Sequence, residues 1–301
     1  MGKYYIGHIC YNGSKFFGWQ KQKEVRTVQQ DIYDSIRSLY EFGRIDVKAT
    51  SRTDRGVHSF GQVVKILIPR KEDADYMLKH VNSALPDDMY LSDLTRINPS
   101  FRVTHMALDK EYLYFFTPDN THKNHSFIGL NNSGEELDFE LMNQACEHFV
   151  GVHDFTNFQY KSEVSGDKVR EIVSCHIKCA SEIFPHHFSK EDNVFCLAIR
   201  GKGFLKQMVR IIMGCLLNVG IGKVSLAEVD ASLKLESDEK KGYIASGAGL
   251  FLYDVRFPPL DKGTLTEIVD SRSYKEKFPQ FELWQSEGVS GFNLFEELEG
   301  A

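Results

Sequence analysis

The sequence predicts an α+β protein with two similar halves, and three observations support this. Strand-like alternation and helical periodicity follow one another in a similar order twice along the chain. Each half has more strand patterns than helix patterns, which is typical of antiparallel sheets covered by helices on one face. The chain has 301 residues, 42% of them hydrophobic and 26% charged, which suffices for two ordinary globular domains.

The first half begins with residues 3–11, which alternate in polarity, are rich in Tyr and Ile, and predict a strand. A helix follows, because apolar residues recur at helical spacing at Val28, Ile32, Ile36 and Leu39. Thr27 with Gln30 predicts a capping box at its start. Further patterns predict strands at 44–50 and 59–68, a helix at 73–84 and a strand near 89–97. The outline of this half is β-α-β-β-α-β.

The second half repeats this order of elements. The patterns predict a strand at 107–117, a helix at 138–150 with Asp138 as N-cap, strands at 170–183 and 193–200, a helix at 204–219 and a strand at 249–257. Between the halves, residues 118–137 are polar and contain Pro118, Gly129 and Gly134, which indicates a long loop. We therefore expect domains at 1–105 and 106–260, followed by a separate tail at 261–301.

The tail carries much of the negative charge of the protein. Residues 261–301 hold nine acidic and four basic residues, a net charge of −5, which leaves only −1 of the total −6 for the remainder. A nearly neutral body can still present a basic cleft, since local potential steers a polyanion. Two interpretations of the tail stay open, a flexible appendage and a partner-binding segment. Its apolar residues, Trp284, Phe292, Leu294 and Phe295, exceed what plain disorder requires.

Nothing in the sequence predicts a membrane segment or an export signal. No run approaches eighteen apolar residues, and Met1–Tyr4 leads directly into a strand pattern. We therefore expect a cytoplasmic protein without a membrane partner.

The six cysteines are scattered, mostly within apolar runs, so free buried thiols are expected. Cys175, His176 and Cys179, near His186 and His187, suggest zinc, but the paired Cys-x-x-Cys spacing is missing and both cysteines fall in an expected strand. We therefore predict no metal.

The octapeptide Arg52–Ser59 is the most informative stretch of the chain. It places Asp54 between a cation and Gly56, directly before a strand-like run. Two interpretations are open from these residues alone. Asp followed two positions later by Gly is common in an ordinary turn, in which Gly adopts positive φ. Alternatively, the carboxylate is a reacting group.

Further motifs support the second interpretation when taken together. They are the segment Tyr11–Gln20 with its Gly-Trp-Gln, Thr27–Gln29, Leu85–Asp88, Phe101–Arg102, Glu111–Tyr114, His153–Phe155, Phe204–Arg210 with Gly214 and Val219–Gly220, and Gly249–Leu252. In this order they span about residues 4–257, which is far more specific than any one motif. With the octapeptide, they resemble the TruA family of tRNA pseudouridine synthases.

The resemblance implies roles for five residues. Asp54 is the essential carboxylate, and Arg210 is the cation that keeps it ionised. Tyr112 stacks on the target uracil and is a candidate for proton transfer. Leu250 packs beneath the base, and Arg52 helps to extrude the uridine from its stem.

Each role has a structural alternative. Tyr112, Tyr114 and Phe116 alternate as core aromatics would, Leu250 could be an ordinary core leucine, and Arg210 an exposed residue on a helix. For Arg210, the apolar neighbours favour a packed turn. His58 is expected to hold the loop rather than to react.

The resemblance also implies a fold, a substrate and an assembly. The fold is a pair of RRM-like (ferredoxin-like) domains, whose antiparallel sheets form a central cleft. The substrate is the anticodon stem-loop of tRNA, modified at positions 38–40, recognised largely by shape. The chemistry demands no cofactor, and the family acts as a homodimer.

Departures from the family pattern are small. They are Ser51, Arg55, Lys206 and Gln207, and none removes a catalytic group. The sequence argues against two rival functions. An RNA-binding protein without activity is disfavoured by the joint presence of Asp54, Tyr112 and Arg210. A hydrolase using Asp54 and His58 lacks any accompanying nucleophile motif, metal cluster or phosphate loop.

Overall fold

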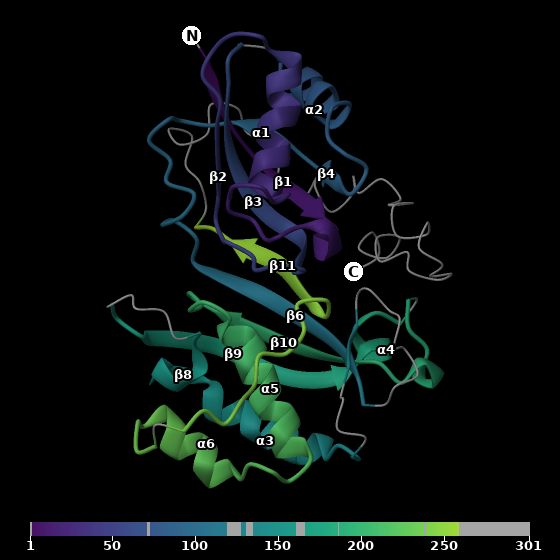
Figure 1. Ribbon diagram of the computed structural model, residues 1–301, viewed down its shortest axis with the longest axis vertical. Helices are drawn as coiled ribbons and strands as arrows, with labels where there is room; N and C mark the ends of the chain where they lie inside the picture. Colours follow the sequence, from purple (N-terminus) through teal and green to yellow (C-terminus); the bar gives the residue numbers. More distant parts are fainter. Residues whose placement is uncertain are drawn as a thin grey trace. The chain divides into compact units, whose positions relative to one another are not determined.

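The computed structural model describes seven stretches of the chain (Figure 1): residues 2–70, 73–118, 128–130, 135–160, 166–185, 187–237 and 239–258. The chain forms two compact units. One comprises Met1–Leu108 and the chain from Asp254 onward, and the other comprises Asp109–Tyr253. Residues 106–108 and 254–258, which were expected in the second domain, thus group with the first unit. The predicted tail 261–301 lies outside the described residues.

The first unit contains five strands, two α-helices and one short 3₁₀ turn within the described residues. They are β1 (Lys3–Tyr11), η1 (Gly13–Lys15), α1 (Val28–Leu39), β2 (Asp46–Ala49), β3 (His58–Ile68), α2 (Ala74–Asn82), β4 (Met89–Leu91) and β5 (Thr95–Arg96). β1 pairs antiparallel with β3 on one side and with β4 and β5 on the other, and β2 pairs antiparallel with β3. The sheet of this unit is therefore antiparallel throughout its described pairs.

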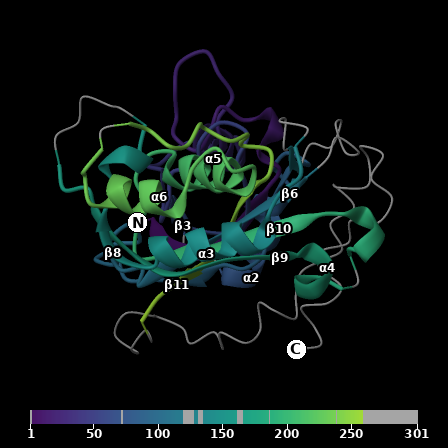
Figure 2. The same cartoon turned by 90° about the horizontal axis from the view of Figure 1, so that it is seen from below.

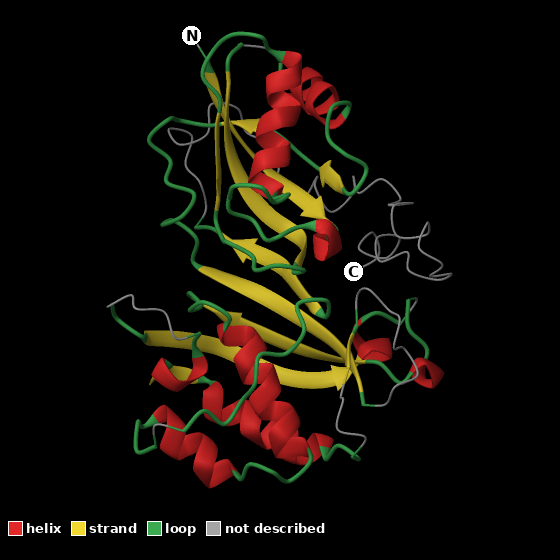
Figure 3. Ribbon diagram, in the orientation of Figure 1, coloured by secondary structure: helices red, strands yellow, loops and turns green. Residues whose placement is uncertain are grey.

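Helices α1 and α2 lie side by side on one face of this sheet (Figures 1 and 3). Their apolar residues, among them Ile32, Ile36 and Met77, are fully buried against strand residues such as Tyr5 and Ile66. Burying one Ile or Met side chain contributes about 1.5–3 kcal/mol. This core stabilises the unit and fixes the ends of β2 and β3, where the Asp54 loop begins and ends.

The strands of the second unit follow the neighbour order β11-β6-β10-β9-β8. Its elements are β6 (Asp109–Thr117), β7 (Gly129–Leu130), α3 (Phe139–Phe149), β8 (Gly151–Asp154), η2 (Thr156–Phe158), β9 (Val169–Cys179), α4 (Ala180–Ile183), η3 (Lys190–Asp192), β10 (Phe195–Gly201), α5 (Met208–Gly220), α6 (Leu226–Leu233) and β11 (Leu250–Arg256). Only β7 is parallel to its partner, β6, among the described pairs of strands. α3 packs against β9, α5 and α6 (Figures 1 and 2).

The α+β class is confirmed, and most predicted elements lie within a few residues of their expected bounds. Several predictions of detail were wrong. Thr27 is the N-cap of α1, but its side chain makes no capping bond. The strand expected at 170–183 ends at Cys179, where α4 begins. The helix expected from 204 begins at Met208, because Gln207 has a φ of 59°, outside the helical region.

The strand expected near 89–97 is divided into β4 and β5, and the elements β8 and α6 were not predicted. Most of the expected loop at 118–137 lies outside the described residues. No helix in the described part of the chain is both long and apolar enough to cross a membrane.

The pair between His8 of β1 and Asp93 should make stability depend on pH. The two side chains meet at 2.7 Å. Burial lowers the pKa of His8, but the charge and hydrogen bond of Asp93, with a contribution from Asp254, outweigh burial, so the pKa is raised. The charged pair therefore stabilises the fold fully below the unfolded pKa of about 6.5, and this part is lost as pH rises through the higher folded value. We expect the wild type to exceed His8→Gln in urea midpoint by more at pH 5.5 than at pH 8.5. An equal difference at both values would contradict the assignment.

Candidate functional site

The Asp54 loop, residues 50–57, joins β2 to β3 and is tied down at its first residues. The Thr50 amide donates to the Val63 carbonyl at 3.0 Å. The buried side chain of Gln62 makes two bonds to Ser51, accepting from its amide at 3.2 Å and donating to its carbonyl at 2.8 Å. Gln62 thus continues the strand pairing with a side chain and holds the loop where backbone pairing ends.

A second segment, from Tyr11 to Trp19, supports the middle of this loop. The Trp19 amide donates to the Thr53 carbonyl at 3.0 Å, and the Gly56 amide donates to the Phe16 carbonyl at 3.2 Å. The Tyr11 hydroxyl meets Thr53 Oγ1 at 2.9 Å. Thr53 is therefore held by its backbone and its side chain, directly before Asp54.

Gly18 allows these two segments to approach each other. Its φ is +92°, which disfavours other residues, and a Cβ at this position would lie 2.6 Å from the Thr53 carbonyl oxygen. The Gly of the Gly-Trp-Gln motif is thus required for close contact with the Asp54 loop.

The loop also contains the turn that the plain interpretation of the octapeptide predicted. The Val57 amide donates to the Asp54 carbonyl at 3.2 Å, and Gly56 has a φ of +76°. Asp54 is half-buried at this turn. The turn and a reacting carboxylate are compatible, since the turn uses the backbone of Asp54.

His58 has a structural function here. It is fully buried, and its Nδ1 accepts a hydrogen bond from the Gly13 amide at 3.0 Å. The ring therefore joins the end of the Asp54 loop to the turn after β1, as the sequence analysis expected.

The surface beside Asp54 is basic and aromatic. Arg52 and Arg55 are exposed, and the Arg55 guanidinium lies 4.3 Å from the centre of the Phe17 ring, which is 41% exposed. Lys15 of the supporting segment is also exposed, as are Lys21 and Lys23, which follow it. Proteins that bind single-stranded RNA commonly combine cations, which contact the phosphates, with exposed aromatic rings, on which bases stack.

The second unit contains Tyr112, Arg210 and Leu250. Tyr112 lies on β6 opposite Ile199 of β10, is 8% exposed, and meets Phe204 edge to face at 5.1 Å. Tyr114, two residues on, lies on the same face of β6. Burial raises the pKa of Tyr114, and the charge of Arg210 acts in the opposite direction. Tyr112 and Tyr114 thus share one face of β6, and both are buried.

Arg210 is the third residue of α5, and its turn is packed as expected, since Val209, Ile211 and Ile212 are buried. Its Nε donates to the Ala245 carbonyl at 2.6 Å. Leu250 begins β11 and is 5% exposed, and its amide donates to the Gly247 carbonyl at 3.0 Å. Both site residues thus contact the segment before β11, of which only Gly249 belongs to a motif of the sequence.

All six cysteines are free thiols, and five of them are buried. Within the described part of the chain, no group of three or more His, Cys, Asp or Glu side chains could hold a metal ion. His186, one of the residues weighed for zinc, lies outside the described residues.

Comparison with known proteins gives one consistent result. The chain matches the family model described as tRNA pseudouridine synthase at residues 9–103 and 145–258. These ranges contain Asp54 and Arg210, whereas Tyr112 lies between them.

Several curated tRNA pseudouridine synthases are similar in sequence to this chain along most of their length. The tRNA pseudouridine synthase A of Bacillus subtilis is 34% identical over 83% of this chain and 97% of its own. tRNA pseudouridine synthase A 2 of Desulfotalea psychrophila is 34% identical over 85% of this chain and 99% of its own. The enzyme of Acetivibrio thermocellus, also named tRNA pseudouridine synthase A, is 31% identical over 83% and 97%, respectively.

Proposed function

We propose that this chain, which belongs to the tRNA pseudouridine synthase family, isomerises uridine to pseudouridine at positions 38–40 of the tRNA anticodon stem-loop. The reaction breaks the bond from C1′ to N1, rotates the released uracil and joins C1′ to C5; C5 then releases its proton to the acceptor, and N1 takes up one proton from solvent. No electrons are gained or lost. The protein must supply an ionised carboxylate, a proton acceptor and a pocket that retains the free base.

The observation that carries this proposal is the geometry of the Asp54 loop. A half-buried carboxylate lies on a turn whose preceding residue, Thr53, is held by two partners. Such a loop keeps the reacting group within a narrow range of positions, which lowers the entropy cost of reaching the transition state. Two chemical routes are open to Asp54. It either attacks C1′ or C6 covalently, or it acts on the C2′ proton in a route through a glycal. Both routes require its carboxylate to be ionised.

The roles of the remaining residues are proposed from the resemblance to the family. Arg210 stabilises the Asp54 anion, because a nearby cation favours the charged form of a carboxyl. Tyr112 stacks on the uracil and is a candidate for moving the C5 proton, while Leu250 packs beneath the ring. Arg52, exposed beside Asp54, helps to extrude the uridine. Arg55 and Phe17 add a contact surface for the RNA.

We extend the proposal to the architecture and assembly. The first unit has the element order β-α-β-β-α-β and the strand order β4-β1-β3-β2, which supports an RRM-like domain. The strand order β11-β6-β10-β9 supports the same for the second unit. We propose that the two sheets form a central cleft and that two copies of the chain bind one tRNA in the cytoplasm. Light scattering from the purified protein distinguishes a dimer from a monomer.

The proposed reaction is tested by tritium release from 5-tritiated uridine in tRNA transcripts. Each transcript has a uridine at only one of the positions 38, 39 and 40 and keeps its uridines elsewhere. We expect release from at least one of them and none from a transcript without uridine there. Tight binding of every transcript without release would indicate a binding protein. Release only from uridines elsewhere would retain the reaction and refute the proposed position.

A further inference from the structure

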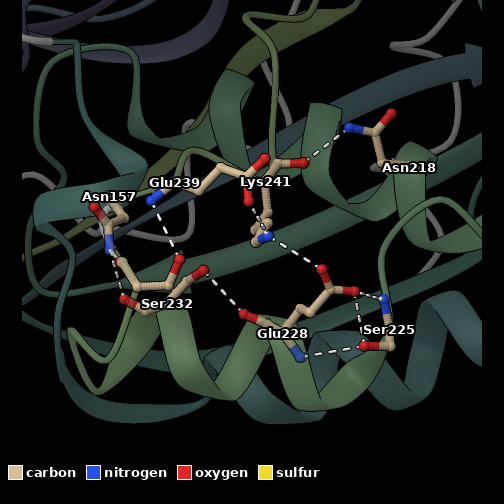
Figure 4. A network of polar contacts seen from close by, with 8 residues as sticks. Asn157, Asn218, Ser225, Glu228, Ser232, Glu239 and Lys241 are labelled. Carbon is tan, nitrogen blue, oxygen red and sulfur yellow. Dashed lines mark hydrogen bonds and ion pairs between the residues drawn. The ribbon is translucent and has the colours of Figure 1, made fainter.

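The segment 239–249, which leads from α6 to β11, is bound to α5 and α6 by hydrogen bonds and ion pairs of the side chains in Figure 4. Lys241 has only 10% of its side chain exposed, and its Nζ lies 3.0 Å from a Glu228 oxygen on α6 and 2.6 Å from a Glu239 oxygen. Asn218 of α5 donates from Nδ2 to the Lys241 carbonyl at 2.8 Å. Lys241 is thus held by its side chain and by its backbone.

Glu228 is fixed in turn by Ser225, which precedes α6. The Ser225 amide and hydroxyl both donate to Glu228 Oε2, at 2.9 and 2.8 Å. These bonds and Lys241 lower the pKa of Glu228 to about 2. Glu228 therefore stays charged at any pH at which the enzyme would work, and it offers Lys241 a permanent anion.

Beyond Lys241 the segment lies directly on the backbone of α5. A Cβ on Gly214 would be 2.1 Å from the Tyr243 carbonyl oxygen, and one on Gly242 would be 2.2 Å from the Ile211 carbonyl oxygen. No side chain fits between the two backbones at these points. The backbone of the segment and the backbone of α5 are therefore in direct contact at residues 242 and 243.

The segment then reaches the candidate site. The Ala245 amide donates to the Arg210 carbonyl at 3.2 Å, and Arg210 Nε donates back to the Ala245 carbonyl at 2.6 Å. Four residues later, the Phe115 amide donates to the Gly249 carbonyl at 2.8 Å, directly before Leu250. One short segment thus orients the Arg210 guanidinium and places Leu250 beside β6.

We propose that Lys241 and Asn218 are positioning residues for the isomerisation, acting through segment 239–249 on Arg210 and Leu250; the inference rests on the proposed function. Without the Lys241 ammonium, Glu228 and Glu239 lose their shared cation and repel one another. The segment then moves away from α5, and the Ala245 carbonyl no longer fixes the plane of the guanidinium. Such misplacement by about 1 Å can cost up to about 10²-fold in rate.

The test compares Lys241→Met with Lys241→Arg, which retains the charge. Lys223→Met is the matched control, because Lys223 also pairs with a glutamate, Glu135, but its side chain is 58% exposed and its ion pair involves no residue of the segment. We expect Lys241→Met to lower the single-turnover rate of tritium release about tenfold, while the affinity for tRNA changes less than about twofold. Lys241→Arg should recover most of the rate, and the control should match the wild type.

A second readout does not depend on turnover. The ¹⁵N resonance of the Arg210 Nε–H group reports its hydrogen bond to Ala245. We expect this signal to exchange faster with solvent in Lys241→Met and to be restored in Lys241→Arg. That result would support the positioning role even if the wild type released no tritium, an outcome that refutes the proposed function alone.

Three results would overturn the inference. The first is a folded Lys241→Met with the wild-type rate. The second is a parallel loss of rate and tRNA affinity that Lys241→Arg does not recover, which indicates a general structural defect. The third is an unchanged Arg210 Nε–H signal in Lys241→Met.

Discussion

Replacing Asp54 with Asn should abolish tritium release while leaving tRNA binding nearly intact. Asn has the shape of Asp but cannot supply the anion that either chemical route requires. The Asp54 loop is held by contacts that do not use this carboxylate, namely the bonds of Thr53, Gly56 and Gln62. We expect the single-turnover rate to fall at least about 10³-fold, which corresponds to about 4 kcal/mol of lost transition-state stabilisation.

The matched control is Asp75→Asn, since Asp75 is an exposed carboxylate in the first turn of α2. It removes the same charge from the first unit and should leave the rate unchanged. Filter binding of the tRNA should give the same affinity for both variants within about threefold, because a single charge among many phosphate contacts has a small effect. Equal rates for Asp54→Asn and the wild type would mean that another group is the reacting carboxylate.

The sequence predicted the elements of this fold well wherever apolar residues repeat over a long stretch. β1, α1, β3 and α3 fall close to their expected bounds because the periodicity extends over nine residues or more. β8, with four residues, is too short to give a pattern. α6 carries a capping box at Ser225 and Glu228, so its start could have been predicted from that local signal.

The site was predictable only in part, for a physical reason. Asp54 stands in a motif, and its turn geometry follows from Gly56. The residues that support it come from other parts of the chain, as Gln62, Tyr11 and Gly18 show. The Ala245 carbonyl that holds Arg210 is a backbone atom, and any residue type supplies one. Sequence identifies the groups with distinctive chemistry, whereas tertiary structure determines the ordinary groups that orient them.

Replacing Arg210 tests whether the cation acts on the Asp54 carboxylate, which is the central electrostatic claim of the proposed mechanism. Arg210→Met removes the charge and the bond to Ala245, whereas Arg210→Lys retains a charge but not the planar guanidinium. We expect the rate of Arg210→Met to fall about 10²-fold or more, as for other preorganised groups that stabilise charge. Arg210→Lys should lie between this variant and the wild type, and Lys234→Met, which removes an exposed cation after α6, should have no effect.

The pH dependence of the rate separates an electrostatic role from a purely structural one. If Arg210 stabilises the Asp54 anion, its removal lets the carboxyl bind a proton at higher pH. The acid limb of the single-turnover rate should therefore move to higher pH in Arg210→Met, and part of the lost rate should return as pH is raised. Arg210→Lys should show a smaller displacement. A rate that falls by the same factor at every pH would show that Arg210 supports the architecture of α5 and segment 239–249 but does not control the charge of Asp54.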